Sequence, residues 1–466
     1  MKNKEIIQRL WSLFNLLRDE GITDGQYLTE ISYMLCIKIM KEKNIMYAEE
    51  MWNELLNHVG TGIGKELIRR YNWMLQMMEE RSDKELKHFF YMASSDIREA
   101  RYLEMLLMSI EELDLNNIDG VIEFYDVLTY RCLNPRTSGQ HLTPLVLSKV
   151  LVELIAPQRE EECNDPVCGS FRFMVDAYEY VRKYNVEEGE QEQSMITQCF
   201  SGTEINPLMY RVSVIHALLH GMSIHNICCG NIFEEKNTLG IQRKQYDVII
   251  ANPPMGGRID NDVFWNKDWC RVHTSDLSLN FLQYIYHSLK VRQDEGARAA
   301  VVIPDVALFD SGAGKVIRQD MMDKCNVHTI LRLPRGILLP YTSVLINVLF
   351  FNRGKEEKES TKEIYFYDMR TDMPKFSMTN PVNYGHFKKF IQAYQADDRR
   401  KVLDERWTCY TREEIRQRED TFDLGLIKKK IDLSLEKEID PVKTGINIVF
   451  QLKKAAELIE SVIEEL

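Results

Sequence analysis

One short segment carries residues that can do chemistry on an amino group. An apolar run, Tyr246–Ala251, stops at Asn252 and is followed at once by Pro253, Pro254 and Met255. The prolines have fixed φ angles and no backbone N–H, so the turn is stiff and keeps its carbonyl acceptors. An Asn oxygen beside a rigid proline carbonyl makes a site with two acceptors for one aromatic –NH2 group. Hydrogen bonds from both N–H groups to these acceptors draw the nitrogen lone pair out of conjugation with the ring. The segment therefore predicts a site that prepares an amine for methyl transfer.

The same residues also suit a plain loop at the end of a strand, because Asn-Pro commonly begins a turn. Three further segments favour a ligand site at the carboxyl edge of an α/β sheet. They read SGQHLTP (138–144), DPVCGSFRF (165–173) and SGTEINP (201–207), before helices expected at 145–155, 174–184 and 208–219. In the third segment an acid, Glu204, is placed at the end of a strand.

The elements that position these residues differ on the two sides of Thr143. Before it, apolar residues recur at helical spacing over 6–17, 28–39, 51–58, 67–78 and 97–107. After it, helices alternate with short apolar runs at 246–251, 299–303, 328–333, 344–351 and 364–367. This alternation predicts an α/β fold with an at least partly parallel sheet. The last two of these runs, joined by a charged loop, are expected to form an antiparallel pair.

We therefore expect a helical N-terminal domain over residues 1–118, an α/β domain over 119–397 and a charged, helical C-terminal segment over 398–466. In that last segment, apolar residues follow one another at alternating steps of 3 and 4, at Val449, Leu452, Ala456, Ile459, Ile463 and Leu466. Such a seam suits a helix packed on its own domain and equally a helix that docks on a partner.

Composition excludes several classes of protein. No run of about 18 apolar residues exists, so no transmembrane helix is expected, and the charged N-terminus lacks the features of a signal peptide. The ten cysteines form no CxxC pair, which indicates reduced thiols and a cytoplasmic protein. A net charge of −12 argues against a stand-alone nucleic-acid binder coated in Lys and Arg, but it leaves room for a local basic groove or a partner that supplies the phosphate contacts.

Three other motifs fail on inspection. The stretch DSGAGKV would need Gly in place of Phe309 and Ser or Thr in place of Val316 to be a nucleotide-phosphate loop. The stretch GSFRFM lacks the glycine pattern of dinucleotide-dependent dehydrogenases. His216 and His220 have the spacing of a zinc-binding helix, but no Glu follows His216, so we expect core or surface histidines.

Taken in order, the segments resemble a known family: the modification (M) subunits of type I restriction–modification systems, which are adenine-N6 DNA methyltransferases. The resemblance covers most of the chain and extends to AAVVIPDVALFDSGAGKVIRQDM, LRLPRGILLPYTSVLINVLFFNRG and IYFYDM. It implies a Rossmann-like, S-adenosylmethionine-dependent methyltransferase domain that acts on double-stranded DNA. It also implies a specificity (S) subunit that reads the DNA, a restriction (R) subunit in the full complex, and a second copy of this chain held through the specificity subunit.

The resemblance implies roles for individual residues as well. The segment 140–145 would line the methionine end of the cofactor, the loop from 165 would approach it closely, Glu204 would accept its ribose hydroxyls and Asn231 would contact its adenine. The residues expected to contact the cofactor are Gln140, His141, Leu142, Thr143, Pro144, Leu145, Asp165, Gly169, Ser170, Phe171, Arg172, Glu204 and Asn231. The catalytic set would be Asn252, Pro253, Pro254 and Met255, acting on an adenine flipped out of the duplex. No metal is expected.

Four features depart from the family pattern. The family's loop reads G-[ST]-G-[GA]-F, whereas this chain places Phe171 and Arg172 at two positions that are small where the backbone approaches the cofactor. The residues before the loop, QREEECN, are too polar for a comfortable central strand. Met255 stands in place of an aromatic residue that stacks on the flipped base, and Asn231 lacks the charge of an Asp.

Two interpretations therefore stay open. In one, the altered loop still works and the chain transfers methyl groups. In the other, the chain is a catalytically degenerate subunit that serves in DNA binding and complex assembly. Cofactor binding and methyl transfer would separate them, and one structural observation bears on both: whether Phe171 and Arg172 fill or clear the space beside Glu204.

Overall fold

The computed structural model describes residues 2–61, 64–133, 142–184, 196–233, 244–258, 270–292, 296–339, 344–355, 357–371, 373–374, 376–377 and 379–424. Residues 1–425 cluster as one compact unit, and residues 426–466 are assigned to a second. The apolar seam expected over 449–466 lies outside the described residues.

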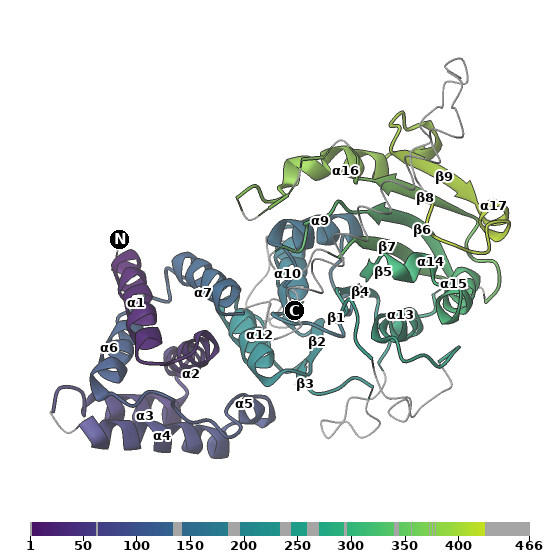
Figure 1. Ribbon diagram of the computed structural model, residues 1–466. Coiled ribbons are helices and arrows are strands. Elements are labelled where there is room, and N and C mark those ends of the chain that lie inside the picture. The colour runs from purple at the N-terminus through teal and green to yellow at the C-terminus, as the bar shows by residue number, and fades with distance from the viewer. Residues whose placement is uncertain are drawn as a thin grey trace, which may run out of the picture. The chain divides into compact units, whose positions relative to one another are not determined.

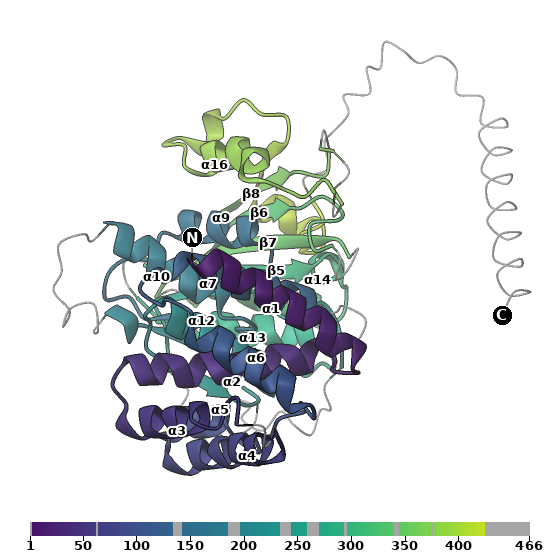
Figure 2. The same ribbon diagram turned by 90° about the vertical axis from the view of Figure 1, so that its left-hand side faces the viewer.

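The N-terminal part is helical, as its apolar spacing predicts. Its helices are α1 (Lys2–Asp19), α2 (Asp24–Glu42), α3 (Met46–Leu56), α4 (Gly64–Arg81), α5 (Lys84–Phe89), α6 (Ala100–Glu111) and α7 (Asp119–Cys132). Gly21, at φ +91°, follows the end of α1, where only glycine adopts such a φ without strain. Thr23 and Gln26 then exchange hydrogen bonds in a capping box that starts α2. Helix α2 contacts α1, α3, α6 and α7, and it also contacts α12 of the α/β part (Figures 1 and 2).

The described strands form one nine-stranded sheet in the order β3-β2-β1-β4-β5-β7-β6-β8-β9. They are β1 (Cys163–Asp165), β2 (Phe200–Glu204), β3 (Ile227–Cys229), β4 (Val248–Ala251), β5 (Ala297–Pro304), β6 (Cys325–Arg332), β7 (Ile346–Arg353), β8 (Glu363–Asp368) and β9 (Trp407–Thr411). The five strands from β3 to β5 pair in parallel. The chain runs outward from β1 through β2 to β3 and then returns to β4, so the strand order reverses between β1 and β4. Ligands bind at such a reversal in open α/β sheets.

Helices cover both faces of the sheet (Figure 1). Helices α9 (Leu145–Ile155), α10 (Arg172–Tyr184) and α12 (Pro207–Leu219) pack on one face, and α13 (Leu277–Ser288), α14 (Val306–Phe309) and α15 (Ala313–Lys324) pack on the other. Strand β4 shows why: Val248 and Ile250 belong to the first apolar core, whereas Ile249 and Ala251 belong to the second. Side chains alternate across a strand, so a strand covered on both faces is apolar throughout.

Short elements complete the described chain. They are η2 (Tyr384–Phe387), α16 (Lys388–Tyr394), η3 (Arg399–Lys401) and α17 (Arg412–Arg416). In the part of the chain that the structure describes, no helix combines the length and the apolar character needed to cross a membrane.

Two expectations about the C-terminal half are wrong. The strands expected at 344–351 and 364–367 exist as β7 and β8, but they do not pair with each other. Strand β7 lies between β5 and β6, antiparallel to both, and β8 pairs in parallel with β6. The reason lies in β7 itself, which is buried along nearly its whole length and therefore suits the interior of a sheet.

The second error concerns the segment from 398, which we expected to be helical. Strand β9 lies within it and pairs antiparallel with β8 at the end of the strand order. Beyond Trp407, β9 is only half-buried or exposed, so its residues carry little of the apolar signal of an interior strand. The domain boundaries themselves stay a prediction.

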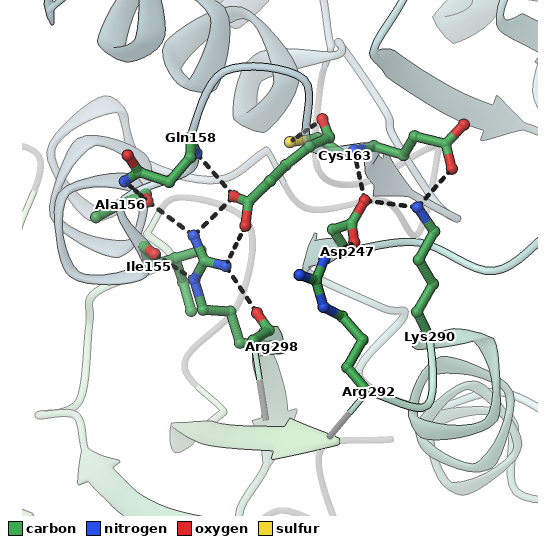
Figure 3. A network of polar contacts seen from close by, with 11 residues as sticks. Ile155, Ala156, Gln158, Cys163, Asp247, Lys290, Arg292 and Arg298 are labelled. Carbon is green, nitrogen blue, oxygen red and sulfur yellow. Dashed lines mark hydrogen bonds and ion pairs between the residues drawn. The ribbon is translucent and has the colours of Figure 1, made fainter. Parts of the chain in front are cut away.

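The polar residues before β1 are accommodated by ion pairs (Figure 3). Arg298 on β5 donates to both carboxylate oxygens of Glu161, at 2.8 and 2.9 Å. The same guanidinium donates to the carbonyls of Ile155 and Ala156, at 2.7 and 2.8 Å, where α9 ends and its last carbonyls need donors. The central strand is therefore real but only three residues long, and the acids before it are paired.

A second group of contacts in Figure 3 centres on Asp247. Asp247 accepts from the backbone N–H of Glu162 at 3.0 Å, from Lys290 at 2.7 Å and from Arg292 at 2.8 Å. Burial alone would raise the pKa of Asp247, but these donors, with Lys290 foremost, bring that pKa below its usual value. Asp247 thereby ties the start of β4 to the residues that lead into β1.

Candidate active site

A cavity of about 340 Å³ lies at the carboxyl ends of β1, β2 and β4, where the strand order reverses. It brings together residues from all four segments that the sequence singles out. Its described lining consists of Leu142, Pro166, Val167, Gly169, Thr203, Glu204, Ile205, Met209, Gly230, Asn231, Ile232, Phe233, Asn252, Pro253, Pro254, Arg258, Leu277 and Phe281.

Asn252 follows β4 directly and presents an unused acceptor. Its side-chain nitrogen donates to the hydroxyl of Thr143 at 3.0 Å. Its side-chain oxygen is buried and has no hydrogen-bond partner among the described residues. A buried polar atom without a partner costs about 1–3 kcal/mol, so such an atom calls for an explanation. Since Asn252 lines the cavity, a donor bound there would satisfy it.

Glu204 ends β2 with both carboxylate oxygens held in place. One oxygen accepts from the backbone N–H of Gly169 at 2.9 Å, and the other accepts from that of Asn206 at 2.7 Å. The side chain of Asn206 in turn caps the start of α12. A carboxylate only accepts hydrogen bonds, and Glu204 lines the cavity, so its side chain suits a ligand that brings hydroxyl donors.

Asp165, at the end of β1, is a second acid behind the cavity. It is 2% exposed, and one of its oxygens accepts from the backbone N–H of Val167 at 3.1 Å. Burial raises the pKa of Asp165 to about 8; the bond from Val167 acts against this rise, and the charge of Glu204 adds to it. Burial therefore favours the protonated form of Asp165.

Phe171 does not occupy the cavity. It is fully buried and absent from the lining, and its ring packs against Gly202 of β2, where an added Cβ would come within 2.9 Å of the ring. The residue adopts φ +64°, a left-handed conformation that costs a non-glycine residue about 1–3 kcal/mol. Burial of a phenyl ring offsets a cost of this size.

Arg172 also points away from the cavity, into a polar network. It contacts Asp126 of α7 at 3.2 Å and Asp176 of α10 at 2.7 Å. His216 joins the same network through Asp126, at 3.0 Å, and its other ring nitrogen contacts the carbonyl of Ser170 at 2.8 Å. The network therefore fastens the loop 169–171, here called the glycine loop, to helix α7.

The histidines at 216 and 220 are accounted for by such pairs, since His220 contacts Glu179 at 3.2 Å. No group of three or more metal-ligating side chains is found in the described ranges.

Of the remaining expected residues, some line the cavity and others do not. Leu142, Asn231, Pro253 and Pro254 line it, and the side chain of Asn231 accepts from the backbone N–H of Phe233 at 3.1 Å. Thr143 reaches it through Asn252, and Pro144 lies at the start of α9. Leu145 is exposed, and Met255 is half-buried against the first apolar core. Gln140 and His141 lie outside the described residues.

Several lining residues were missed, chiefly the apolar ones. Ile205 is 61% exposed although it follows the buried Glu204, and the rings of Phe233 and Phe281 lie with centroids 4.6 Å apart. An apolar residue directly after the strand-end acid was a signal that could have marked Ile205. Nothing local marks Phe281, because it reaches the cavity from α13, far along the chain.

Comparison with known proteins shows the family of this chain. A sequence model of the family described as N-6 DNA Methylase matches residues 119–433, more than half of the chain. The EcoKI methylase subunit of a type I restriction enzyme, from Escherichia coli K12, is 29% identical over 100% of this chain and 96% of its own length. The StySPI methylase subunit from Salmonella potsdam shows the same identity and coverage.

Solved structures show the same fold. A chain from a structure of the type I R-M system superposes with a TM-score of 0.78 at 22% identity, covering 100% of this chain and 98% of the other. The crystal structure of the EcoKI M protein is 28% identical, with a TM-score of 0.54, and covers 90% of this chain and 89% of the other. The protein is thus homologous along its length to the methylase subunits of type I restriction enzymes, and it belongs to the N-6 DNA methylase family.

Proposed function

We propose that this chain methylates the N6 amine of an adenine extruded from double-stranded DNA, with S-adenosylmethionine as the methyl donor. The observation that carries the proposal is the buried oxygen of Asn252, which has no partner in the described structure and lies on a cavity that Pro253 also lines. This oxygen suits a ligand that brings N–H donors. An exocyclic amine of a flipped base is such a ligand.

The residues present fit S-adenosylmethionine in chemical type. Glu204 offers acceptors for a ribose diol, and Asn231 offers an amide to the cofactor's adenine. Ile205, Ile232 and Phe233 offer apolar surface for an aromatic base. When bound, S-adenosylmethionine supplies an electrophilic methyl group on a sulfonium centre.

The chain's own residues would then orient the amine. The oxygen of Asn252 and the carbonyl of Pro253 accept its two N–H groups, which raises the electron density on nitrogen. The largely apolar lining excludes water, so these hydrogen bonds are not weakened by competition. Positioning of the amine supplies much of the acceleration. Met255 ends the catalytic segment, but it packs against the first apolar core and does not line the cavity.

The degenerate interpretation is not favoured. It depended on Phe171 and Arg172 blocking the site, and both side chains lie outside the cavity lining. The amide, both prolines and the acid all remain around one open cavity.

We further propose that the chain works as the modification subunit of a type I system, in the cytoplasm. Its partners would be a specificity (S) subunit that reads the DNA, a second copy of this chain held through that subunit, and a restriction (R) subunit in the full complex. The net charge of −12 supports this division of labour, because another chain would supply most phosphate contacts.

The test is methyl transfer from labelled S-adenosylmethionine to duplex DNA by the chain purified with its specificity subunit. We expect Asn252→Ala to lower kcat about 100-fold or more, the order of loss seen when one catalytic hydrogen-bonding group is removed, while cofactor binding stays close to wild type and the variant still unfolds cooperatively. Asn53→Ala, at an exposed position of α3, is the matched control. Full activity of Asn252→Ala would refute the proposal.

A further inference from the structure

Thr143 contacts the catalytic amide and not the cavity. Its hydroxyl accepts from the side-chain nitrogen of Asn252 at 3.0 Å, and the lining includes its neighbour Leu142 but not Thr143 itself. We propose that Thr143 is a positioning residue that holds the Asn252 side chain in place at the edge of the cavity. This inference rests on the proposed function and assigns Thr143 a role different from the cofactor contact that the family resemblance implies.

The orientation matters because the two ends of an amide have opposite polarity. The nitrogen end carries two donors and the oxygen end carries two acceptor sites. An amide turned by half a rotation would present donors to an adenine amine, which is itself a donor. In the structure Thr143 holds the nitrogen end, and the oxygen end is the atom found buried without a partner among the described residues.

Both partners are carried by elements that contact each other. Thr143 precedes Pro144, which restricts Thr143 to extended conformations, and α9 begins at the next residue, Leu145. Helix α9 contacts β4 and β5 and buries Leu147 and Val150 completely. Asn252 is the first residue after β4. The hydrogen bond therefore joins two fixed points and can hold the amide to the tolerance of about 0.5 Å that catalysis requires.

The decisive variants are Thr143→Val, which keeps the shape and removes the hydroxyl, and Thr143→Ser, which keeps the hydroxyl. With the purified complex, we expect Thr143→Val to lower kcat about tenfold, the order expected for one lost hydrogen bond. The dissociation constant for S-adenosylmethionine, measured by calorimetry, should stay unchanged, and Thr143→Ser should restore kcat. Thr29→Val is the matched control, because it removes a hydroxyl that donates to a carbonyl within α2, at 2.9 Å.

Two kinetic results would overturn the inference. One is an unchanged kcat in Thr143→Val. The other is a raised dissociation constant for S-adenosylmethionine with kcat intact at saturation, which would make Thr143 a cofactor contact.

A double-mutant cycle in thermal unfolding tests the contact without any activity. Thr143→Val should lower the unfolding temperature of the wild-type chain but should have little further effect on Asn252→Ala. Equal lowering in both backgrounds would overturn the contact. If the wild-type complex transfers no methyl group while the cycle shows coupling, the proposed function has failed and the contact stands.

Discussion

Asp165 is a buried acid at the end of β1, beside the strand end that carries Glu204. The pKa of Asp165, raised to about 8 by burial, means that the folded chain binds this proton more tightly than the unfolded chain, where a pKa of about 4 is usual. The stabilisation is complete below about pH 4 and is lost as the pH rises through about 8.

We therefore expect Asp165→Asn to become progressively more stable than wild type as the pH rises from about 5 to about 8. Asparagine keeps the oxygen that accepts from Val167 and carries no charge to bury. The measurement is the free energy of unfolding in urea at both pH values. Asp19→Asn, at an exposed position of α1, is the control and should show no such trend. A stability difference that does not change with pH would mean that Asp165 titrates normally.

At the scale of single residues, the sequence predicted well those site residues that directly follow a strand or end it. Asn252 and Glu204 were expected at strand ends, and the structure brings both to one cavity. The positions of Phe171 and Arg172 were not predictable, because they depend on distant residues. The Phe171 ring fits only because Gly202 has no side chain there, and the Arg172 guanidinium is held by Asp126 on α7.

At the scale of elements, the glycine loop is held by α7, a helix of the N-terminal part of the chain. Asp126 of α7 contacts both Arg172 and His216, and His216 contacts the Ser170 carbonyl. Partly buried charged pairs of this kind are costly to break, because the remaining charge keeps its desolvation penalty. Cofactor binding should therefore depend on a residue that lies outside the cavity.

We expect Asp126→Asn to raise the dissociation constant for S-adenosylmethionine severalfold and to leave kcat at saturating cofactor unchanged. The change keeps the size of the side chain and removes its charge, so the loop should loosen without losing its shape. Calorimetry and steady-state kinetics measure the two quantities. Glu179→Gln, on α10 but in ion pairs with Arg182 and His220, is the control. A normal dissociation constant in Asp126→Asn would show that the loop holds itself.

The elements found from the sequence were those with strong local patterns. The N-terminal helices and the strands β4 to β8 carry apolar spacing that packing then confirms. Strand β1 was doubtful because its stabilisation comes from Arg298 on β5, and the pairing of β7 was wrong because local pattern does not fix strand order. Pairing depends on which faces are covered, and that is decided by contacts far along the chain.

At the scale of the whole molecule, the acidity limits what the chain can do alone. With a net charge of −12, we expect the isolated chain to bind duplex DNA no more tightly than about 10⁻⁶ M at physiological salt, the upper end of non-specific affinity. The complex with the specificity subunit should bind far more tightly and with a steeper salt dependence. Fluorescence anisotropy with a labelled duplex measures both. Tight binding by the isolated chain would contradict this prediction and would mean that this chain itself carries the DNA-reading surface.

The contact between Phe171 and Gly202 means that substitutions at these two positions depend on each other. A methyl group at 202 would come within 2.7 Å of the Cβ of Cys168 and within 2.9 Å of the ring at 171. Among descendants of this sequence, a side chain at 202 should therefore arise only after room has been made at both 168 and 171, whereas glycine at 202 can persist whatever stands there. The order of such changes along a lineage is thus set by packing.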